Sequence, residues 1–163
     1  MLNRLLAAAL CACAFSSPAH SVDSDGTRPD PVLTPGEIRT TDRDAICGHS
    51  TSEFRNVSVT TKIAARRAYG ITGEHGGWCG AEGCEIDHRV PLVVGGGNTP
   101  GSIKNLWPQR PDGPNGFRTK DRCEAAAGRA ICAGTLSVVG AQAIFLGDWV
   151  ANCATFLASP AAR

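Results

Sequence analysis

Two adjacent residues, Asp87 and His88, have the side chains of this sequence best suited to catalysis. A carboxylate can hold a hard divalent cation through oxygen, while an imidazole, with an ordinary pKa near ~6.5, can take a proton from water at neutral pH. Successive side chains of a strand point to opposite faces, so both residues can serve one site only where the strand ends or bends. Pro91 and the glycines at 95–97 predict such a bend.

The segments around this pair predict a short hairpin. Residues 84–88 alternate polar and apolar side chains and indicate a strand, and a second short strand is expected at 105–107. On the returning strand, the amide of Asn105 can bond backbone across the hairpin and fix the loop.

The assembled string resembles the HNH endonuclease family, in a branch of secreted or phage-associated bacterial proteins. Its core motif reads EIDH at 85–88, PL at 91–92, GG within 95–97 and NLWPQ at 105–109. The resemblance spans roughly residues 45–150 and takes in RNVS at 55–58, Lys62, YGI at 69–71, KD at 120–121, Glu124, AQ at 141–142 and DW at 148–149. It implies an α+β fold, with a small ββα-metal core and additional packing helices; the cysteines described below add disulfide bonds to this fold.

The same resemblance implies roles for three residues. His88 is the expected general base, Asp87 the expected ligand of a divalent cation, and Asn105 the central Asn that supports the loop. The expected ion is Mg²⁺, with Mn²⁺ or Zn²⁺ as alternatives. The expected substrate is DNA, with RNA as the alternative, and hydrolysis would leave a 5′-phosphate and a 3′-hydroxyl. We expect the protein to act as a monomer.

The sequence departs from the family at the third motif position, because residues 113–120 hold no histidine. Asn115 is the best oxygen donor there by type, while Arg118 or Lys120 could contact phosphate instead. Arg55 is a further candidate for phosphate contact. A missing protein ligand need not abolish activity, since Mg²⁺ keeps several waters.

A helix is expected within residues 57–69, capped by Ser58 or Thr60. Lys62 and Arg66 share its exposed face, which is either a solvated charged surface or a contact to phosphate.

Two further helical segments are expected after the hairpin. Residues 117–131 predict a helix despite Gly128. This helix would supply the α of the ββα unit. Residues 136–157 are apolar enough to pack over the core, with Gly147 as a possible division and Trp149 inside.

The chain begins with features of an export signal: Arg4, an apolar run at 5–15 and small residues at Ala19 and Ser21. The run is shorter than the ~20 residues of a membrane span, so we expect no stable insertion after its removal, a retained anchor being the alternative. Without residues 1–21 the balance is 15 basic against 15 acidic residues, since Arg4 is lost from 16. A basic surface that binds nucleic acid must therefore be a local patch.

The remaining organisation follows from composition. A length of 163 residues with 42% hydrophobic composition suits one domain. A flexible leader is expected at 22–44, because it is rich in Pro, Gly, Asp, Ser and Thr without apolar periodicity. The nuclease domain is expected at 45–157 and a tail at 158–163.

An even set of cysteines remains outside the signal segment and fits a secreted or periplasmic protein: Cys47, Cys79, Cys84, Cys123, Cys132 and Cys153. Six cysteines allow 15 connectivities. We choose Cys79–Cys84, for its short loop, with Cys47–Cys132 and Cys123–Cys153. A structural zinc site is the alternative, but such sites use Cys-x-x-Cys pairs, which the sequence lacks.

Two functional alternatives stay open. His75, in the glycine-rich loop at 73–83, either approaches the metal or is solvated. The whole chain could also be a non-catalytic, disulfide-stabilised module that binds nucleic acid or protein, because fold does not guarantee function. The presence of both Asp87 and His88 favours the enzyme.

Overall fold

The computed structural model describes residues 25–111, 113 and 115–163. This part of the chain holds five α-helices and one two-stranded antiparallel sheet, so the predicted α+β class is confirmed. The expected signal peptide at 1–21 lies outside the described residues. No helix among the described residues is long and apolar enough to cross a membrane.

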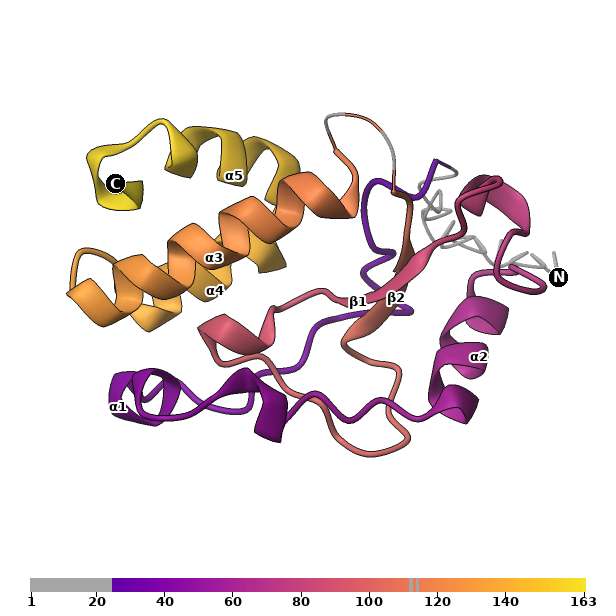
Figure 1. The fold of residues 1–163 in the computed structure, drawn as a ribbon, viewed down its shortest axis with the longest axis horizontal. Coiled ribbons are helices and arrows are strands. Elements are labelled where there is room, and N and C mark those ends of the chain that lie inside the picture. Colours follow the sequence, from indigo (N-terminus) through magenta and orange to yellow (C-terminus); the bar gives the residue numbers. More distant parts are fainter. Residues whose placement is uncertain (1–24, 112, 114) are drawn as a thin grey trace, which may run out of the picture.

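The sheet is the predicted hairpin, at the centre of the molecule (Figure 1). β1 (Glu85–His88) pairs with β2 (Leu106–Gln109), and His88 lies opposite Leu106. The second strand begins one residue later than predicted and includes Pro108. Pro108 has no N–H to donate, but β2 has only one partner strand and can hold it.

The chain bends sharply after β1, as Pro91 and the glycines predicted. A 3₁₀ helix, η3 (Leu92–Val94), ends at Gly95 with a left-handed φ of 89°. At Gly96 a Cβ would lie 1.9 Å from the carbonyl oxygen of Val90, so only glycine fits there. This bend turns the chain away directly after His88 and leaves the end of β1 open on one side.

Three helices cover one side of the hairpin: α3 (Phe117–Ala133), α4 (Val138–Leu146) and α5 (Trp149–Leu157). Their inner faces form the larger core, in which Trp149 is 1% exposed. Gly147 separates α4 from α5, so the predicted division is confirmed. Gly128 is accommodated in α3 because the side chain of Val93 packs where its Cβ would be.

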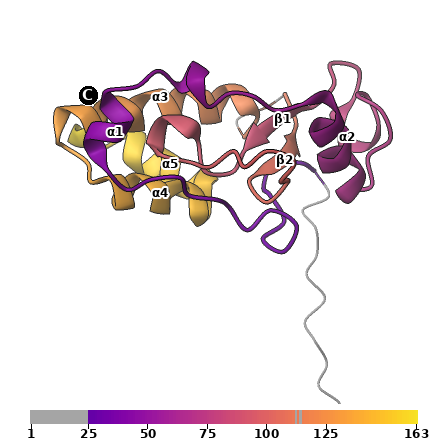
Figure 2. The ribbon, with the colours of Figure 1, turned by 90° about the horizontal axis from the view of Figure 1, so that it is seen from below.

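The opposite side of the hairpin is covered by α2 (Val59–Ala68), as Figures 1 and 2 both show. Of the two predicted caps, Ser58 is the one used, since its side chain accepts from the backbone N–H of Thr61 at 3.1 Å. A smaller core lies on this side of the sheet and includes Tyr69, Ile71 and Trp107. The short elements are α1 (Arg43–Cys47), η1 (Thr51–Glu53), η2 (Gly77–Cys79) and η4 (Pro160–Ala162).

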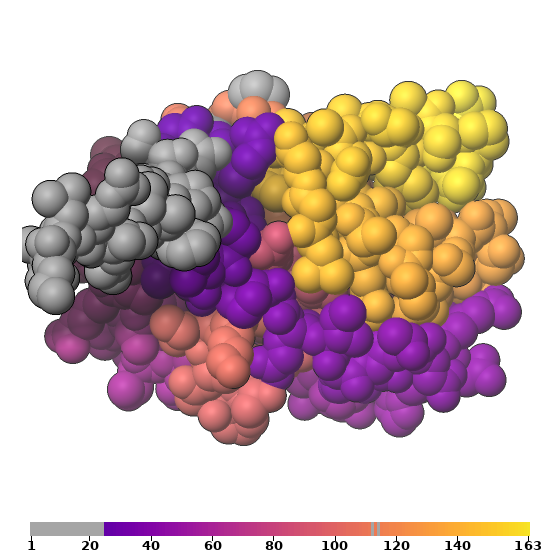
Figure 3. Space-filling view, turned by 180° about the vertical axis from the view of Figure 1, so that it is seen from behind, coloured from indigo at the N-terminus to yellow at the C-terminus, as the bar shows by residue number. Residues whose placement is uncertain are grey.

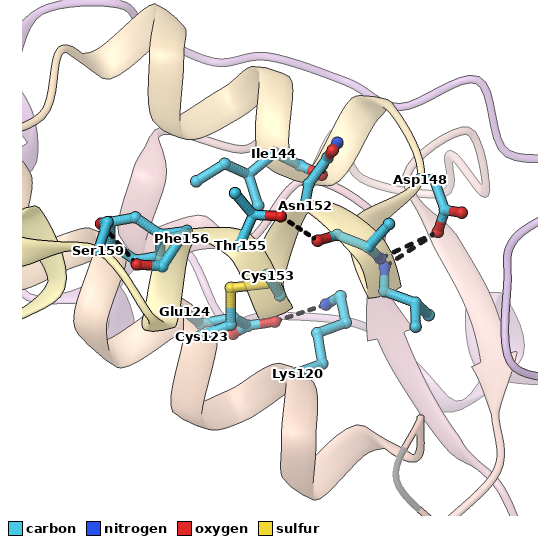
Figure 4. The surroundings of a disulfide bond; sticks show 12 residues. Lys120, Cys123, Glu124, Ile144, Asp148, Asn152, Cys153, Thr155, Phe156 and Ser159 are labelled. Carbon is cyan, nitrogen blue, oxygen red and sulfur yellow. Dashed lines mark hydrogen bonds and ion pairs between the residues drawn. A yellow bond between two sulfur atoms is a disulfide. The ribbon is translucent and has the colours of Figure 1, made fainter.

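All three predicted disulfides are present. Cys47–Cys132 joins α1 to the end of α3, and Cys79–Cys84 closes the loop that leads into β1. Cys123–Cys153 ties α3 to α5 inside the larger core (Figure 4). All six cysteines are bonded, so none is available for the alternative zinc site. Such a set fits a non-cytoplasmic protein.

Residues 25–42 differ from the predicted flexible leader, because from Asp25 onward they pack along the domain. Thr34 is fully buried, and its hydroxyl lies 2.8 Å from that of Tyr69 and donates to the carbonyl of Leu106. The indole N–H of Trp149 donates to the carbonyl of Thr27 at 2.8 Å. Figure 3 shows this indigo segment lying against the yellow C-terminal helices. Hydrogen bonds to residues distant in the sequence hold this segment in place, and amino-acid composition does not indicate such bonds. The predicted tail also makes contact, since Ala161 and Ala162 pack against the core.

Candidate active site

The bend after β1 leaves a pocket of about 440 Å³ between β1, η3, α3 and the segment at 51–57. Its charged lining is divided between cations and carboxylates. The side chains concerned are Arg55, Lys62, Glu85, Asp87, Asp121 and Glu124, together with His88. This pocket is therefore where the predicted Asp-His pair lies, and both members line it.

A hydrogen bond joins the side chain of Asp87 to the backbone of His88 at the end of β1. Oδ1 of Asp87 accepts from the backbone N–H of His88 at 2.7 Å, which fixes the carboxylate beside the pocket. His88 is 9% exposed, and its Nε2 has no hydrogen-bond partner among the described residues. A buried polar atom left without a partner costs about 1–3 kcal/mol, and such atoms need an explanation, of which a functional role is one. The atom is covered by protein in this structure, so water or substrate would reach it only after a small shift of the pocket wall.

The imidazole of His88 is suited to accept a proton. Burial lowers its pKa. The negative charge of Asp87 and the nearby amide of Asn98 oppose this effect, while the positive charge of Lys120 adds to it. His88 is therefore neutral at pH 7, the form in which an imidazole can take a proton.

Lys120 lies beneath the pocket, at the back of the Asp-His pair. Its Nζ donates to Oδ2 of Asp87 at 2.7 Å, to the carbonyl oxygen of His88 at 2.7 Å and to Oε1 of Glu124 at 2.5 Å. These three acceptors use all three donors of an ammonium group. Burial would lower the pKa of Lys120, but Asp87 and Glu124 outweigh it and raise the pKa above its usual range, so the group stays charged.

This position corrects the prediction that Lys120 contacts substrate phosphate. The side chain is 1% exposed and fully engaged within the protein. Figure 4 shows Lys120 and Glu124 side by side on α3, next to the Cys123–Cys153 disulfide. The sequence places a lysine near the start of α3 but does not show that this position is on the inner face of the helix.

The other carboxylates give the pocket an excess of negative charge. Burial, followed by repulsion from Asp87, raises the pKa of both Glu85 and Asp121. Burial also raises the pKa of Glu124, even though Lys120 opposes it. One buried ammonium therefore does not fully neutralise this cluster, and its hard oxygens are those that a divalent cation prefers.

The donor set suits a loosely held ion. Within the described residues, no three His, Cys, Asp or Glu side chains are arranged as a ready-made metal site. Asp87 and Glu124 nevertheless converge, because both lie against the same ammonium. Two carboxylates with water in the remaining positions match the coordination of Mg²⁺.

Asn105 holds the loop behind the pocket. It is 2% exposed; its Oδ1 accepts from the N–H of Val90 at 2.8 Å, and its Nδ2 donates to the carbonyls of Val90 and Gly97 at 2.9 and 2.8 Å. The predicted bonding of this amide to the backbone is confirmed. Asn105 does not line the pocket, so it supports the site from behind.

The remaining predicted residues divide between the pocket and its surroundings. Arg55 lines the pocket and is exposed, as a phosphate contact requires. Asn115, just before α3, and Arg118, in its first turn, lie outside the lining. Arg118 is close enough to lower the pKa of Asp121 in the pocket, so its contact with phosphate stays a prediction, as does the role of Asn115. His75 is exposed in its loop and is also outside the pocket.

Three acidic residues of the pocket were not predicted as site residues: Glu85, Asp121 and Glu124. Glu124 could have been found from its spacing, because it follows Lys120 by four residues on an expected helix, where opposite charges meet. Glu85 carried a weaker signal, since alternation places it on the same side of β1 as Asp87.

No family model, curated protein or solved structure matches the chain. Evidence for the function therefore comes from the residues of the pocket and from the motif that lines it.

Proposed function

We propose that this protein is an exported, metal-dependent endonuclease of the HNH type, which hydrolyses phosphodiester bonds of DNA. The observation that carries the proposal is the placement of His88 beside Asp87 at the end of β1, in a pocket that combines exposed cations with a carboxylate cluster. The order of β1, β2 and α3, with the Asp-His pair at the end of β1 and Asn105 behind the loop, supports the ββα-metal assignment.

The residues of the pocket divide the reaction between them. Arg55 and Lys62 line the same pocket as the carboxylates and would hold the nonbridging oxygens of a phosphodiester. Nε2 of His88 would take a proton from the water that attacks phosphorus. The P–O3′ bond then breaks, and the leaving 3′ oxygen takes a proton from solvent, so the products are a 5′-phosphate and a 3′-hydroxyl. His88 returns its proton to solvent before the next turnover.

Asp87 and Glu124 would hold the divalent cation. When bound, the ion supplies positive charge to a nonbridging oxygen and to the leaving 3′ oxygen. Lys120 acts through Asp87, because its ammonium bonds Oδ2 and keeps the carboxylate in one orientation. RNA remains the alternative substrate, since none of these contacts involves a 2′-hydroxyl.

Export is supported by the N-terminal segment and by the disulfide bonds. The apolar N-terminal run and its small residues are typical of a cleaved signal, and three disulfides form and persist in oxidising compartments. The site of action would then be the periplasm or the medium.

The second candidate is a binding module that has no turnover. One observation favours it: Oδ2 of Asp87 is already neutralised by Lys120, and Oδ1 is taken by a backbone N–H. Such a protein would still use the pocket to hold an anionic ligand.

Degradation of plasmid DNA by the oxidised, mature chain separates these candidates. We expect cleavage with Mg²⁺ or Mn²⁺, no cleavage with a chelator, and loss of cleavage in His88→Ala. Binding of the plasmid without cleavage under every metal condition would favour the module.

A further inference from the structure

A second hollow, of about 610 Å³, adjoins the active-site pocket and has no part in the reaction described above. Its lining differs from that of the pocket, because it combines an aromatic ring and a guanidinium with amide and hydroxyl groups. The residues that define it are Arg39, Phe54, Asn56, Ser58, Thr60 and Asn98.

The wall between the two hollows is one extended segment of chain, residues 54–58. Its side chains alternate between them: Arg55 and Val57 line the active-site pocket, whereas Phe54, Asn56 and Ser58 line the second hollow. A wall made of one extended segment is about 5 Å thick, which is the spacing between neighbouring strands of a sheet. A group bound in the second hollow therefore lies next to whatever phosphate is bound by Arg55.

A flat stacking surface lies in the second hollow. The guanidinium carbon of Arg39 is 3.8 Å from the centroid of the Phe54 ring, and the ring of His49 meets Phe54 edge-on at 6.5 Å. Asn98 fixes the position of Phe54 by donating to its carbonyl oxygen at 2.7 Å. The acid of this hollow, Glu53, pairs with His49 at 3.3 Å.

The chemistry of this surface matches a nucleobase. Bases stack on aromatic rings and on arginine planes, and amide side chains bond their edges. Resting on the nuclease function proposed above, we propose that the second hollow binds the base of a nucleotide adjacent to the scissile phosphate. A base inside a duplex is already stacked and paired, so the substrate class this selects is single-stranded or locally unpaired nucleic acid.

Fluorescence anisotropy of a short, labelled single-stranded DNA tests the proposal, with the same sequence as a duplex for comparison. Measuring in chelator and in a His88→Ala background makes binding independent of cleavage. Failure of the nuclease proposal would then appear only in the plasmid assay, and failure of the stacking proposal only here.

We expect Phe54→Ala and Arg39→Ala to weaken single-strand binding about tenfold, since stacking contributes roughly 1–3 kcal/mol per base. Arg39→Lys should lose nearly as much, because it keeps the charge and removes the plane. The matched control is Arg129→Ala, which removes an exposed arginine of α3 outside both hollows. Replacing the bases of the oligonucleotide by abasic sites should abolish the difference between parent and variants.

Several results would overturn the proposal. They are equal losses in Arg39→Ala and Arg129→Ala, full affinity in Arg39→Lys, equal losses for single strand and duplex, or no binding of DNA at all. Arg39 is exposed, so its variants report on the hollow even if Phe54→Ala fails to fold.

Discussion

The Nζ of Lys120 lies 2.7 Å from Oδ2 of Asp87, so the carboxylate expected to serve the reaction is held by a buried cation from α3. The same ammonium bonds Glu124 and the carbonyl of His88. This link makes the geometry of the Asp-His pair depend on the packing of α3, and thereby on the Cys123–Cys153 disulfide one turn away.

Replacing Lys120 by methionine should therefore destabilise the protein strongly. The change leaves two partly buried carboxylates without their counter-charge, and breaking a buried pair in this way costs about 3–5 kcal/mol. Lys62→Met is the matched control, since Lys62 is exposed at the pocket and should cost less than about 0.5 kcal/mol. Urea unfolding measures both. A second change, Glu124→Gln, should restore part of the loss in Lys120→Met; equal stability of Lys120→Met and the parent would contradict the buried network.

Removing the imidazole of His88 should abolish most cleavage while leaving the fold intact. Loss of a general base lowers the rate by roughly 10²–10⁴-fold. His75→Ala is the control, because His75 is an exposed histidine outside the pocket and should keep full activity. The measurement is the initial rate of plasmid cleavage at pH 7–8. A rate for His88→Ala within a few-fold of the parent would remove His88 from this role.

The parts of the structure that could be predicted are those with local signals. Ser58 before an apolar run, Gly147 between two apolar segments and the glycines after Pro91 each have a direct conformational consequence, and all three act as expected. The short spacing of Cys79 and Cys84 likewise identified one disulfide.

The parts that could not be predicted depend on distant partners. Thr34 is buried where its hydroxyl donates to the carbonyl of Leu106 and bonds the hydroxyl of Tyr69, and nothing in its own segment indicates these distant partners. The predicted contact of Lys120 with phosphate requires an exposed side chain, as most lysines have, but two carboxylates from β1 and α3 make its burial possible. In the candidate site, the motif predicted Asp87 and His88, and spacing alone could have paired Glu124 with Lys120, but only the fold shows that Glu124 lines the same pocket as Asp87.

The three disulfides should contribute unequally to stability. Their sequence separations are 85, 30 and 5 residues, and a cross-link that closes a longer loop removes more entropy from the unfolded chain. Replacing Cys47 and Cys132 by alanine should cost most, about 4–5 kcal/mol, and replacing Cys79 and Cys84 least, about 2 kcal/mol. Thermal unfolding of the three double variants measures the order. Thiol titration of the denatured, unreduced parent should find no free thiol outside residues 1–24, and several reactive thiols would contradict the pairing.

The attachment of the N-terminal segment should depend on pH through Asp148. This residue accepts two hydrogen bonds from Arg28, at 3.0 and 3.1 Å, and caps α5 through the backbone N–H groups of Val150 and Ala151. The bond from Arg28 lowers the pKa of Asp148 below its ordinary value of 3.8. Because the folded-state pKa is the lower one, the stabilisation is complete above about pH 4 and is lost as the pH falls through the folded-state value. Asp148→Asn keeps a capping oxygen and removes the charge, so it should be less stable than the parent at pH 7, by less than about 1 kcal/mol for so exposed a pair. The difference should shrink as the pH falls below about 4. Urea unfolding across this pH range measures it, with Asp148→Ala as the variant that also loses the cap; a difference between parent and Asp148→Asn that does not shrink on acidification would show that the charge of Asp148 is not its cause.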